Sequence, residues 1–303
     1  MTIARNNHRL KAALSFRMIR FALPAMLAFG AIACQDGGAR EQAPPVLIPR
    51  GQVEREVGGV AVTIYTPPET VAKEIRGDVL VLPGWKYNRK RWLNETPIKS
   101  EADRLGLRLI CPEMGRSIYA SRYFPETGPR WNSNKAGLAW VLEDLLPYLA
   151  GQGVFRSGAA ANNFLLGLST GGRGVALIAL ARPDLIRAAA ALSGDFDQTL
   201  QPADRLMAGH YGSYADFRER WETVDNPLRQ AAGWSTPIYL AHGTQDRVVP
   251  PVHSQEFFES LRTAHPQLDV VLLTPSAGHD FAFWGAQTAP AFAFFEKYLR
   301  TDS

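Results

Sequence analysis

The segment 167–172, which reads Gly-Leu-Ser-Thr-Gly-Gly, constrains the fold of this chain more than any other feature. It follows an apolar run at 164–166 and precedes a helical pattern. A serine at a sharp turn from strand to helix has strained backbone angles, and side chains two positions away on either side would collide, so glycine is needed at both flanks. Gly167 and Gly171 meet this need. We therefore predict that the turn lifts the Ser169 hydroxyl clear of the carboxyl edge of a sheet, at the N-terminus of a helix. A glycine-rich turn that arose by chance is the alternative.

Apolar runs of strand length alternate with helical patterns along the rest of the chain. We expect strands at 60–65, 79–82, 107–111, 164–168, 188–192, 238–241 and 270–273. We expect helices at 100–105, 136–150, 172–181, 251–264 and 289–299. Several strands are apolar at every position, as in strands covered on both faces, and their alternation with helices implies parallel pairing. The predicted fold class is α/β, with a mostly parallel central sheet and helices on both faces.

The first 34 residues have the pattern of an export signal. Five basic residues and no acidic residue accompany an apolar run of 13 residues at 21–33, which is too short for a bilayer core that needs about 20 helical residues. The run leads into Ala31-Ile32-Ala33-Cys34, and small residues before a cysteine resemble the lipobox of bacterial lipoproteins. We predict a signal peptide at 1–34 and a lipid anchor at Cys34 that holds the protein to the membrane of the bacterial cell envelope. An ordinary cleaved signal, with a periplasmic or secreted product, is the alternative.

The charge of the remaining chain is close to neutral. Residues 35–303 hold 28 basic and 29 acidic residues, so the net charge of +4 comes from the signal. A nucleic-acid partner would need a basic face on the folded domain, and the composition gives no support for one. Cys111 is the only cysteine after Cys34 and lies in an apolar run, so we expect a small buried side chain without a disulfide.

These patterns also predict how the rest of the chain is organised. Residues 35–50 mix Gly, Pro, Gln and charges without periodicity, which predicts a flexible tether between the signal and the domain. The folded domain is predicted to span 51–303. One connection between strands is long and rich in aromatic residues, and we predict a lid-like insertion around 196–236 above the strand ends.

A serine hydroxyl attacks a carbonyl group only when an imidazole lies within hydrogen-bond reach and a carboxylate fixes the tautomer of that imidazole. His279 follows the last predicted strand in a loop, where such a base belongs, and is the predicted base. His253 and His265 lie in or at the end of a predicted helix, and we expect them at the surface.

Asp246 is the predicted acid, because it follows the strand at 238–241 and faces the same edge of the sheet as Ser169. Asp195 and Asp197, after the strand at 188–192, are the alternatives. We expect His242 to be structural.

Acyl transfer also needs hydrogen-bond donors for the oxyanion, normally the amide after the nucleophile and one amide from a loop after an earlier strand. Thr170 supplies the first. We predict that Trp85 supplies the second, because Gly84 before it allows the backbone to approach the site. A plain turn at the end of the strand is the alternative.

These segments resemble the esterases of the α/β-hydrolase superfamily, in particular the group of S-formylglutathione hydrolase, feruloyl and acetylxylan esterases and mycolyltransferases. The resemblance covers most of residues 55–300. It includes, besides the segments above, Trp92, the helix end 143–148, Arg182-Pro183-Asp184, Leu192-Ser193-Gly194 with Asp197, Asn226-Pro227 and Gly278-His279-Asp280. The chain departs from the group at two positions: Pro83 stands where many relatives have His, and Trp85 is bulkier than usual.

The resemblance implies an α/β-hydrolase fold and a serine esterase without a cofactor, which forms an acyl-enzyme on Ser169. The cationic residues Lys86, Arg89, Lys90 and Arg91 follow the predicted oxyanion loop. A later loop combines arginines with aromatic residues: Arg116, Arg122, Arg130, Tyr119, Tyr123, Phe124 and Trp131. Together the two groups favour an anionic or aromatic acid or a sugar ester, and hence a small-molecule or glycan-linked ester as substrate. A solvated charged rim is the alternative.

The same triad could serve other functions. It could pass the acyl group to an alcohol, as an acyltransferase. It could also cleave peptides, because the turn at 167–172, which we call the elbow, and the Asp246 loop resemble those of prolyl-oligopeptidase catalytic domains; the chain lacks their large N-terminal propeller. A non-enzymatic envelope protein that binds a ligand on a hydrolase scaffold is the alternative of a different class. The sequence contains no metal-ligand spacing, phosphate loop or dinucleotide motif.

Overall fold

The computed structural model describes residues 48–128, 134–158 and 161–300. These residues belong to one compact unit, which spans 44–303. The predicted signal peptide, Cys34 and most of the predicted tether lie outside the described residues. The predicted start of the folded domain coincides with the first strand.

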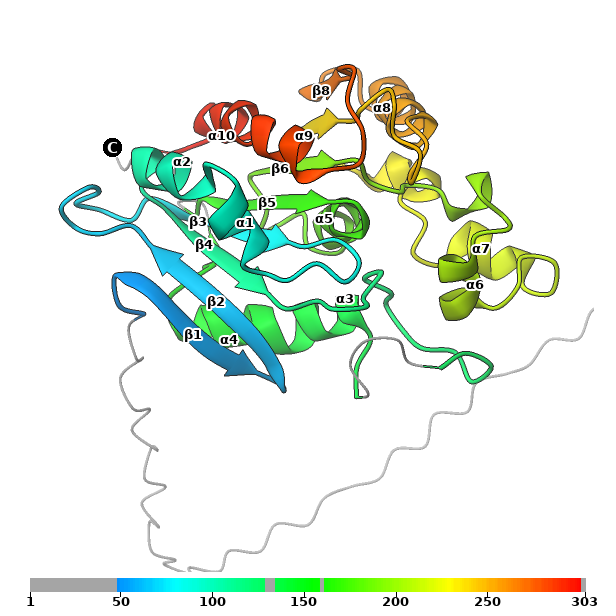
Figure 1. Cartoon of the computed structure of the whole chain (residues 1–303), viewed down its shortest axis with the longest axis horizontal. Coiled ribbons are helices and arrows are strands. Elements are labelled where there is room, and N and C mark those ends of the chain that lie inside the picture. The colour runs from blue at the N-terminus through cyan, green and yellow to red at the C-terminus, as the bar shows by residue number, and fades with distance from the viewer. Residues whose placement is uncertain (1–47, 129–133, 159–160, 301–303) are drawn as a thin grey trace, which may run out of the picture. The chain divides into compact units, whose positions relative to one another are not determined.

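A sheet of eight strands occupies the centre of the described part (Figure 1). The strands are β1 (Gly51–Val57), β2 (Val60–Thr66), β3 (Gly77–Leu82), β4 (Leu107–Pro112), β5 (Asn163–Leu168), β6 (Ala188–Leu192), β7 (Ile238–Ala241) and β8 (Val270–Leu273). Their order is β1-β2-β4-β3-β5-β6-β7-β8. Only the pairs β1–β2 and β2–β4 are antiparallel, and the pairs from β4 through β8 are parallel. The sequence predicted every strand except β1.

Successive residues of the central strands enter opposite faces of the sheet. Leu80 and Leu82 of β3 belong to one hydrophobic cluster, and Val79 and Val81 belong to the other, because side chains alternate along a strand. Both faces of the sheet are therefore covered, and the mostly parallel α/β fold is confirmed.

Helices cover each face of the sheet (Figure 1). One face carries α3 (Gly137–Trp140), a π-helical turn η1 (Val141–Leu145), α4 (Leu146–Gly151), α5 (Thr170–Ala181) and α8 (Val252–Ala264). The other carries α1 (Arg91–Glu95), α2 (Ile98–Leu105), α9 (Phe281–Ala286) and α10 (Thr288–Glu296). The five predicted helices are present, and the sequence did not predict α1 or α9. Within the described ranges, no helix is both long enough and apolar enough to span a bilayer.

The connection between β6 and β7 folds into four short helical elements. They are η2 (Gln198–Leu200), α6 (Arg205–Tyr211), α7 (Arg218–Thr223) and η3 (Leu228–Gly233). Met207, Tyr211 and Trp221 form a separate hydrophobic cluster with Ile118 and Ala120 from the loop after β4. The helices α6 and α7 therefore pack on a loop of the domain, whereas Phe196, Ala231 and Trp234 of the same connection belong to the hydrophobic cluster on one face of the sheet.

Arg173 connects this insertion to α5. Its side chain is completely buried and donates to the Gln198 side chain at 3.0 Å, to the Tyr211 hydroxyl at 3.0 Å and to the Asp225 carbonyl oxygen. A guanidinium group offers five donors in a fixed plane, so one buried arginine can join three segments of the insertion. Asp195, at the start of the connection, is also close to it, at 4.0 Å.

Candidate active site

Ser169 lies at the turn between β5 and α5 with φ 54° and ψ −126°. This φ is in the left-handed region, which side chains other than glycine rarely adopt, and such strain is concentrated at functional sites. A Cβ atom at Gly167 would overlap the carbonyl group of Gly171, and one at Gly171 would overlap the carbonyl oxygen of Leu82. The steric argument for glycine at both flanks is therefore confirmed.

His279 and Asp246 lie in line with the Ser169 hydroxyl. His279 Nε2 is 3.0 Å from Ser169 Oγ, and His279 Nδ1 is 2.6 Å from Asp246 Oδ2. With the proton on Nδ1, the ring donates to the carboxylate and its Nε2 can accept from the hydroxyl. The structure thus brings together the three residues that the sequence singled out, from the loops after β5, β7 and β8.

The surroundings of Asp246 keep its carboxylate ionised. Burial alone would raise its pKa, but hydrogen bonds from His242 and His279 lower the pKa of Asp246 well below its usual value. The second oxygen, Oδ1, accepts from the amides of Val248 at 2.8 Å and Val249 at 2.9 Å. An anion held by several donors is oriented as well as charged.

His242 supports this carboxylate, as expected for a structural residue. It is fully buried, and its Nε2 is 2.9 Å from the Val249 carbonyl oxygen and 3.3 Å from Asp246 Oδ2. Its Nδ1 is 2.7 Å from the Ser254 hydroxyl. The ring therefore ties the Asp246 loop to the start of α8.

The alternative acids occupy other positions. Asp197 accepts from the amide and hydroxyl of Thr199 and from the Asn226 side chain, which makes it part of the framework of the insertion. Asp195 is buried close to Arg173 and makes no hydrogen bond to His279. The geometry favours Asp246 over both.

Two free amides lie beside Ser169. No hydrogen bond within the described ranges uses the amide of Trp85 or of Thr170. The loop that carries Trp85 is packed directly on the elbow, since a Cβ atom at Gly84 would lie 3.1 Å from the Cβ of Ser169. The Tyr119 hydroxyl donates to the Pro83 carbonyl oxygen at 2.9 Å. This bond fixes the loop at the position where the sequence departs from its esterase relatives.

The His279 ring rests on a tryptophan. Trp284 of α9 meets it edge to face, with ring centroids 4.9 Å apart, and donates from Nε1 to the Ser193 hydroxyl at 3.1 Å. A ring held by packing on one side and by a carboxylate on the other keeps the orientation that proton transfer needs.

A cavity of about 130 Å³ adjoins Ser169. Its walls come from the oxyanion loop, the elbow, the insertion and the start of α8: Trp85, Ser169, Thr170, Asp195, Gln198, Gln201, Asp204, Leu206, Met207, Val248, Val249 and His253. The cavity is therefore placed where the acyl or the leaving part of a substrate would lie.

The sequence matches a known protein family. The sequence profile of the prolyl oligopeptidase family matches residues 148–302. This segment covers just over half of the chain and contains Ser169, Asp246 and His279. The chain belongs to the prolyl oligopeptidase family. No curated protein sequence is similar enough to count as a relative.

Solved structures share the fold at low sequence identity. The fluorophosphonate-binding serine hydrolase F of Staphylococcus aureus has a TM-score of 0.63 at 17% identity, over 80% of this chain and 96% of that protein. An S-formylglutathione hydrolase from Agrobacterium tumefaciens has a TM-score of 0.64 at 17% identity, over 82% and 95%. A puromycin-hydrolysing peptidase of Mycobacterium tuberculosis has a TM-score of 0.60 at 19% identity, over 83% of this chain but 40% of that protein.

These structures confirm the α/β-hydrolase fold and include the esterase group that the sequence resembles. Together with the family match, they make this member of the prolyl oligopeptidase family a protein of the serine hydrolase superfamily. Identities below 20% establish the fold and leave the substrate to other arguments.

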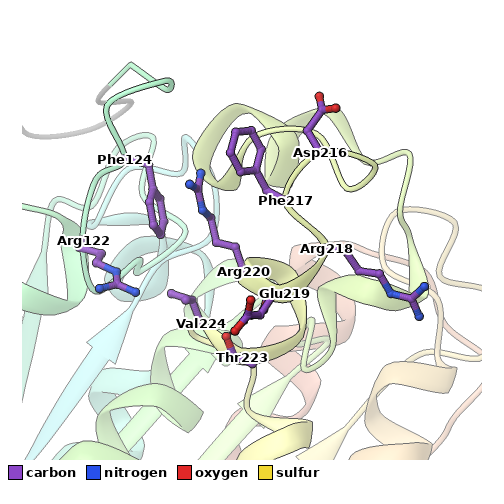
Figure 2. A pocket seen from close by; sticks show the side chains of 9 residues that line it. All are labelled: Arg122, Phe124, Asp216, Phe217, Arg218, Glu219, Arg220, Thr223 and Val224. Carbon is purple, nitrogen blue, oxygen red and sulfur yellow. Dashed lines mark hydrogen bonds between the residues drawn. The ribbon is translucent and has the colours of Figure 1, made fainter.

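A larger hollow lies away from the triad. It measures about 350 Å³ and is lined by residues of α7 and of the loop that contains Arg122 and Phe124 (Figure 2). No residue of the triad lines it. Arg220 lies between the rings of Phe124 and Phe217, 3.7 and 4.0 Å from their centroids, and donates to the Tyr211 carbonyl oxygen at 2.8 Å. This arginine joins α7 to the neighbouring loop.

The structure bears on two expectations about charged and polar residues. Three of the cationic residues after the oxyanion loop are ion-paired: Arg89 with Glu54 and Glu113, Lys90 with Glu54, and Arg91 with Glu95. These pairs support the charged-rim alternative over substrate binding by these residues. The expectation that His253 lies at the surface is wrong, because only 1% of it is exposed. His265 is half-buried, with Nε2 3.0 Å from the Ala231 carbonyl oxygen.

Proposed function

We propose that this protein is a serine esterase, which cleaves a carboxylic ester through an acyl-enzyme on Ser169. The observation that carries the proposal is the chain of hydrogen-bond distances from Asp246 through His279 to Ser169, 2.6 and 3.0 Å long, at a strained turn between a strand and a helix. Such a chain activates a hydroxyl group that is otherwise a weak nucleophile.

The reaction begins when His279 Nε2 takes the proton of the Ser169 hydroxyl as Oγ bonds to the ester carbonyl carbon. The carbonyl oxygen becomes an oxyanion and accepts from the amides of Trp85 and Thr170. When the tetrahedral intermediate collapses, the bond to the alcohol oxygen breaks and His279 returns the proton to it. A water molecule then repeats these steps on the acyl-enzyme and releases the acid. Asp246 stays ionised throughout and stabilises the positively charged ring.

Peptide cleavage is the second candidate. The match to the prolyl oligopeptidase family supports it, as does the likeness to a peptidase fold. The two activities use the same triad and differ in the leaving group. The ratio of kcat/KM for 4-nitrophenyl esters to that for peptide 4-nitroanilides decides between them, and we expect the esters to be preferred by at least about 100-fold. Comparable values for the anilides would favour the peptidase.

The first test is the intact mass of the purified protein after exposure to a fluorophosphonate, with peptide mapping of the adduct. We expect one adduct, on Ser169, and none in Ser169→Ala. Ser169→Ala should also lose at least about 10⁴-fold in kcat on a 4-nitrophenyl ester. Ser276→Ala is the matched control, since this exposed serine lies in the same loop as His279, and it should keep both the adduct and the turnover. A folded protein that forms no adduct would support the non-enzymatic binding protein instead.

A further inference from the structure

The loop after β3 has a flexible joint directly before the Trp85 amide. Gly84 has no Cβ atom, so its backbone dihedrals are less restricted than those of other residues. It joins the peptide plane that precedes it to the plane that carries the Trp85 N–H group. Hydrogen bonds to these two planes therefore determine the direction in which the Trp85 N–H group points.

The carbonyl group of each plane accepts one hydrogen bond. The Tyr87 amide donates to the Gly84 carbonyl oxygen at 3.1 Å, and the Tyr119 hydroxyl donates to the Pro83 carbonyl oxygen at 2.9 Å. The C=O and N–H groups of a planar trans peptide point in opposite directions, so the first bond orients the Trp85 N–H group. The second fixes the plane on the other side of the joint, and it is the one of the two that comes from outside the loop.

The surroundings of Tyr119 hold its side chain tightly. The residue is fully buried, and a Cβ atom at Gly174 of α5 would lie 2.6 Å from Cγ of the ring. The ring therefore packs directly on the helix that begins after Ser169. The Tyr119 amide donates to the Ser117 hydroxyl at 2.9 Å. The backbone of Tyr119 has φ 56°, a conformation that residues other than glycine rarely adopt and that persists only where the surroundings determine it.

The segment that carries Tyr119 lies between the oxyanion loop and the insertion. Ile118 and Ala120 pack in the hydrophobic cluster of the insertion, whereas Tyr119 packs in the cluster on one face of the sheet. The insertion also contacts the loop directly, since His210 of α6 meets the Trp85 ring edge to face with centroids 5.9 Å apart. The contacts of the insertion thus help to place both Tyr119 and Trp85.

The Tyr119 hydroxyl is a donor at any pH at which an esterase is assayed. Burial raises the pKa of Tyr119 well above its ordinary value of 10, so the group stays protonated. The strength of its bond to the Pro83 carbonyl oxygen is therefore independent of the titration of His279.

We propose that Tyr119 is a positioning residue for the oxyanion site: its hydroxyl, through the Pro83 carbonyl group, holds the Trp85 amide where the oxyanion of the tetrahedral intermediate forms. The inference rests on the proposed esterase activity, since it assigns a role in the same reaction. Tyr119 acts through the loop and not on the substrate. Loss of its hydroxyl should therefore weaken an interaction that forms in the transition state and leave substrate binding unchanged.

The test is steady-state kinetics of Tyr119→Phe on a 4-nitrophenyl ester, because this change removes the hydroxyl and keeps the ring. Loss of a whole oxyanion donor costs about 10²–10³-fold in kcat, and a misplaced donor should cost less. We expect kcat to fall about 10- to 100-fold, by the same factor at each pH, with KM within about twofold of the wild type.

Tyr239→Phe is the matched control. Tyr239 of β7 is also buried, and its hydroxyl donates to Gln287 Oε1 at 2.6 Å, so this variant loses a comparable bond away from the oxyanion loop. It should keep kcat within about twofold of the wild type.

A thionoester, in which sulfur replaces the carbonyl oxygen of the same ester, separates positioning from a general loss of structure. Sulfur accepts hydrogen bonds weakly, so the oxyanion amides contribute less to its hydrolysis. The ratio of kcat/KM for the ester to that for the thionoester should fall at least about fivefold in Tyr119→Phe and stay within about twofold of the wild type in Tyr239→Phe. A partly folded variant would lose activity on both substrates by the same factor.

Gly174→Ala is the second variant if Tyr119→Phe does not fold. Its methyl group would displace the Tyr119 ring while the hydroxyl remains. The ratio for the two substrates should then fall at least about threefold.

The outcomes separate this inference from the proposed function. Wild-type kcat in a folded Tyr119→Phe protein, or an unchanged ratio of the two substrates, would overturn the inference and leave the esterase intact. A rise in KM with kcat unchanged would also overturn it, since Tyr119 would then act in substrate binding. If the wild-type protein showed no Ser169-dependent hydrolysis and no fluorophosphonate adduct, the proposed function itself would be rejected.

Discussion

Two buried carboxylates lie near Ser169, and their surroundings set them apart. Asp246 accepts from two amides and two imidazole rings, which lowers its pKa. Asp195 has an unpartnered oxygen and a pKa raised by burial. The first carboxylate is suited to hold a histidine, and the two environments shift the two pKa values in opposite directions.

This difference allows a direct test of which carboxylate orients His279. Asp246→Asn should lower kcat on an unsubstituted short-chain ester by about 10⁴-fold, because the amide would favour the wrong tautomer of His279. In Asp195→Asn, kcat on the same ester should fall by no more than about 100-fold. The measurement is steady-state kinetics on one ester for both variants, with circular dichroism as the check on folding. If Asp195→Asn removed turnover and Asp246→Asn did not, the assignment of the acid would be reversed.

The sequence predicted the triad because loops after parallel strands meet at one edge of the sheet, so the position of a residue along the chain determines its place in space. It did not predict the burial of His253. A histidine in the first turn of a helix is exposed unless another segment covers it, and here the insertion does so: the Asp197 amide contacts the ring. Contacts between segments far apart in sequence leave no local pattern, and unpartnered atoms are found only in the structure.

The elements that the sequence missed are those without a continuous apolar pattern. β1 alternates half-buried and exposed residues and includes three charged side chains, so it has the composition of a loop. It forms because β2 offers an antiparallel edge and because Glu54 pairs with Arg89 and Lys90. The helices α1 and α9 have five and six residues, which is too short for a helical period to stand out.

The pairing of β1 predicts a pH-dependent contribution to stability. Burial alone would raise the pKa of Glu54, but hydrogen bonds from Lys90, Thr63 and Arg89 lower it to about 2, from 4.5. A pKa that folding lowers stabilises the folded state above the unfolded value, and this stabilisation is lost as the pH falls from about 5 towards 2.

Glu54→Gln should therefore lower the melting temperature at pH 7 by a few degrees. The side chain is 44% exposed, so solvent screening limits the effect to about 1 kcal/mol or less. Thermal unfolding should be measured at pH 7, 5 and 3. The difference in melting temperature between Glu54→Gln and the wild type should become smaller as the pH falls. Glu56→Gln, on the same exposed side of the strand, is the control and should match the wild type at each pH. A difference as large at pH 3 as at pH 7 would mean that Glu54 acts through packing rather than charge.

The whole chain combines a hydrolase domain with an N-terminal segment that differs from it in charge and composition. All five basic residues of the first 34 precede the apolar run, whereas the rest of the chain is close to neutral. Cys111, the other cysteine, is buried, and burial raises the pKa of its thiol to about 12, so it is an inert thiol. Only Cys34 is left as a site for lipid attachment. We propose that the protein is exported and acylated there, with residues 35–50 as the tether to the domain.

Expression in a bacterial host with an alkynyl palmitate analogue tests this proposal. Acylated protein should carry the label, sediment with membranes and leave them only with detergent. Cys34→Ser should lose the label and become extractable without detergent, while its esterase activity stays within about twofold of the wild type, because the triad lies entirely within the domain. Cys111→Ala is the matched control and should stay labelled. An unlabelled wild-type protein cleaved elsewhere in the leader would instead establish an ordinary signal peptide, and the domain would then reach its substrates by diffusion rather than from a membrane surface.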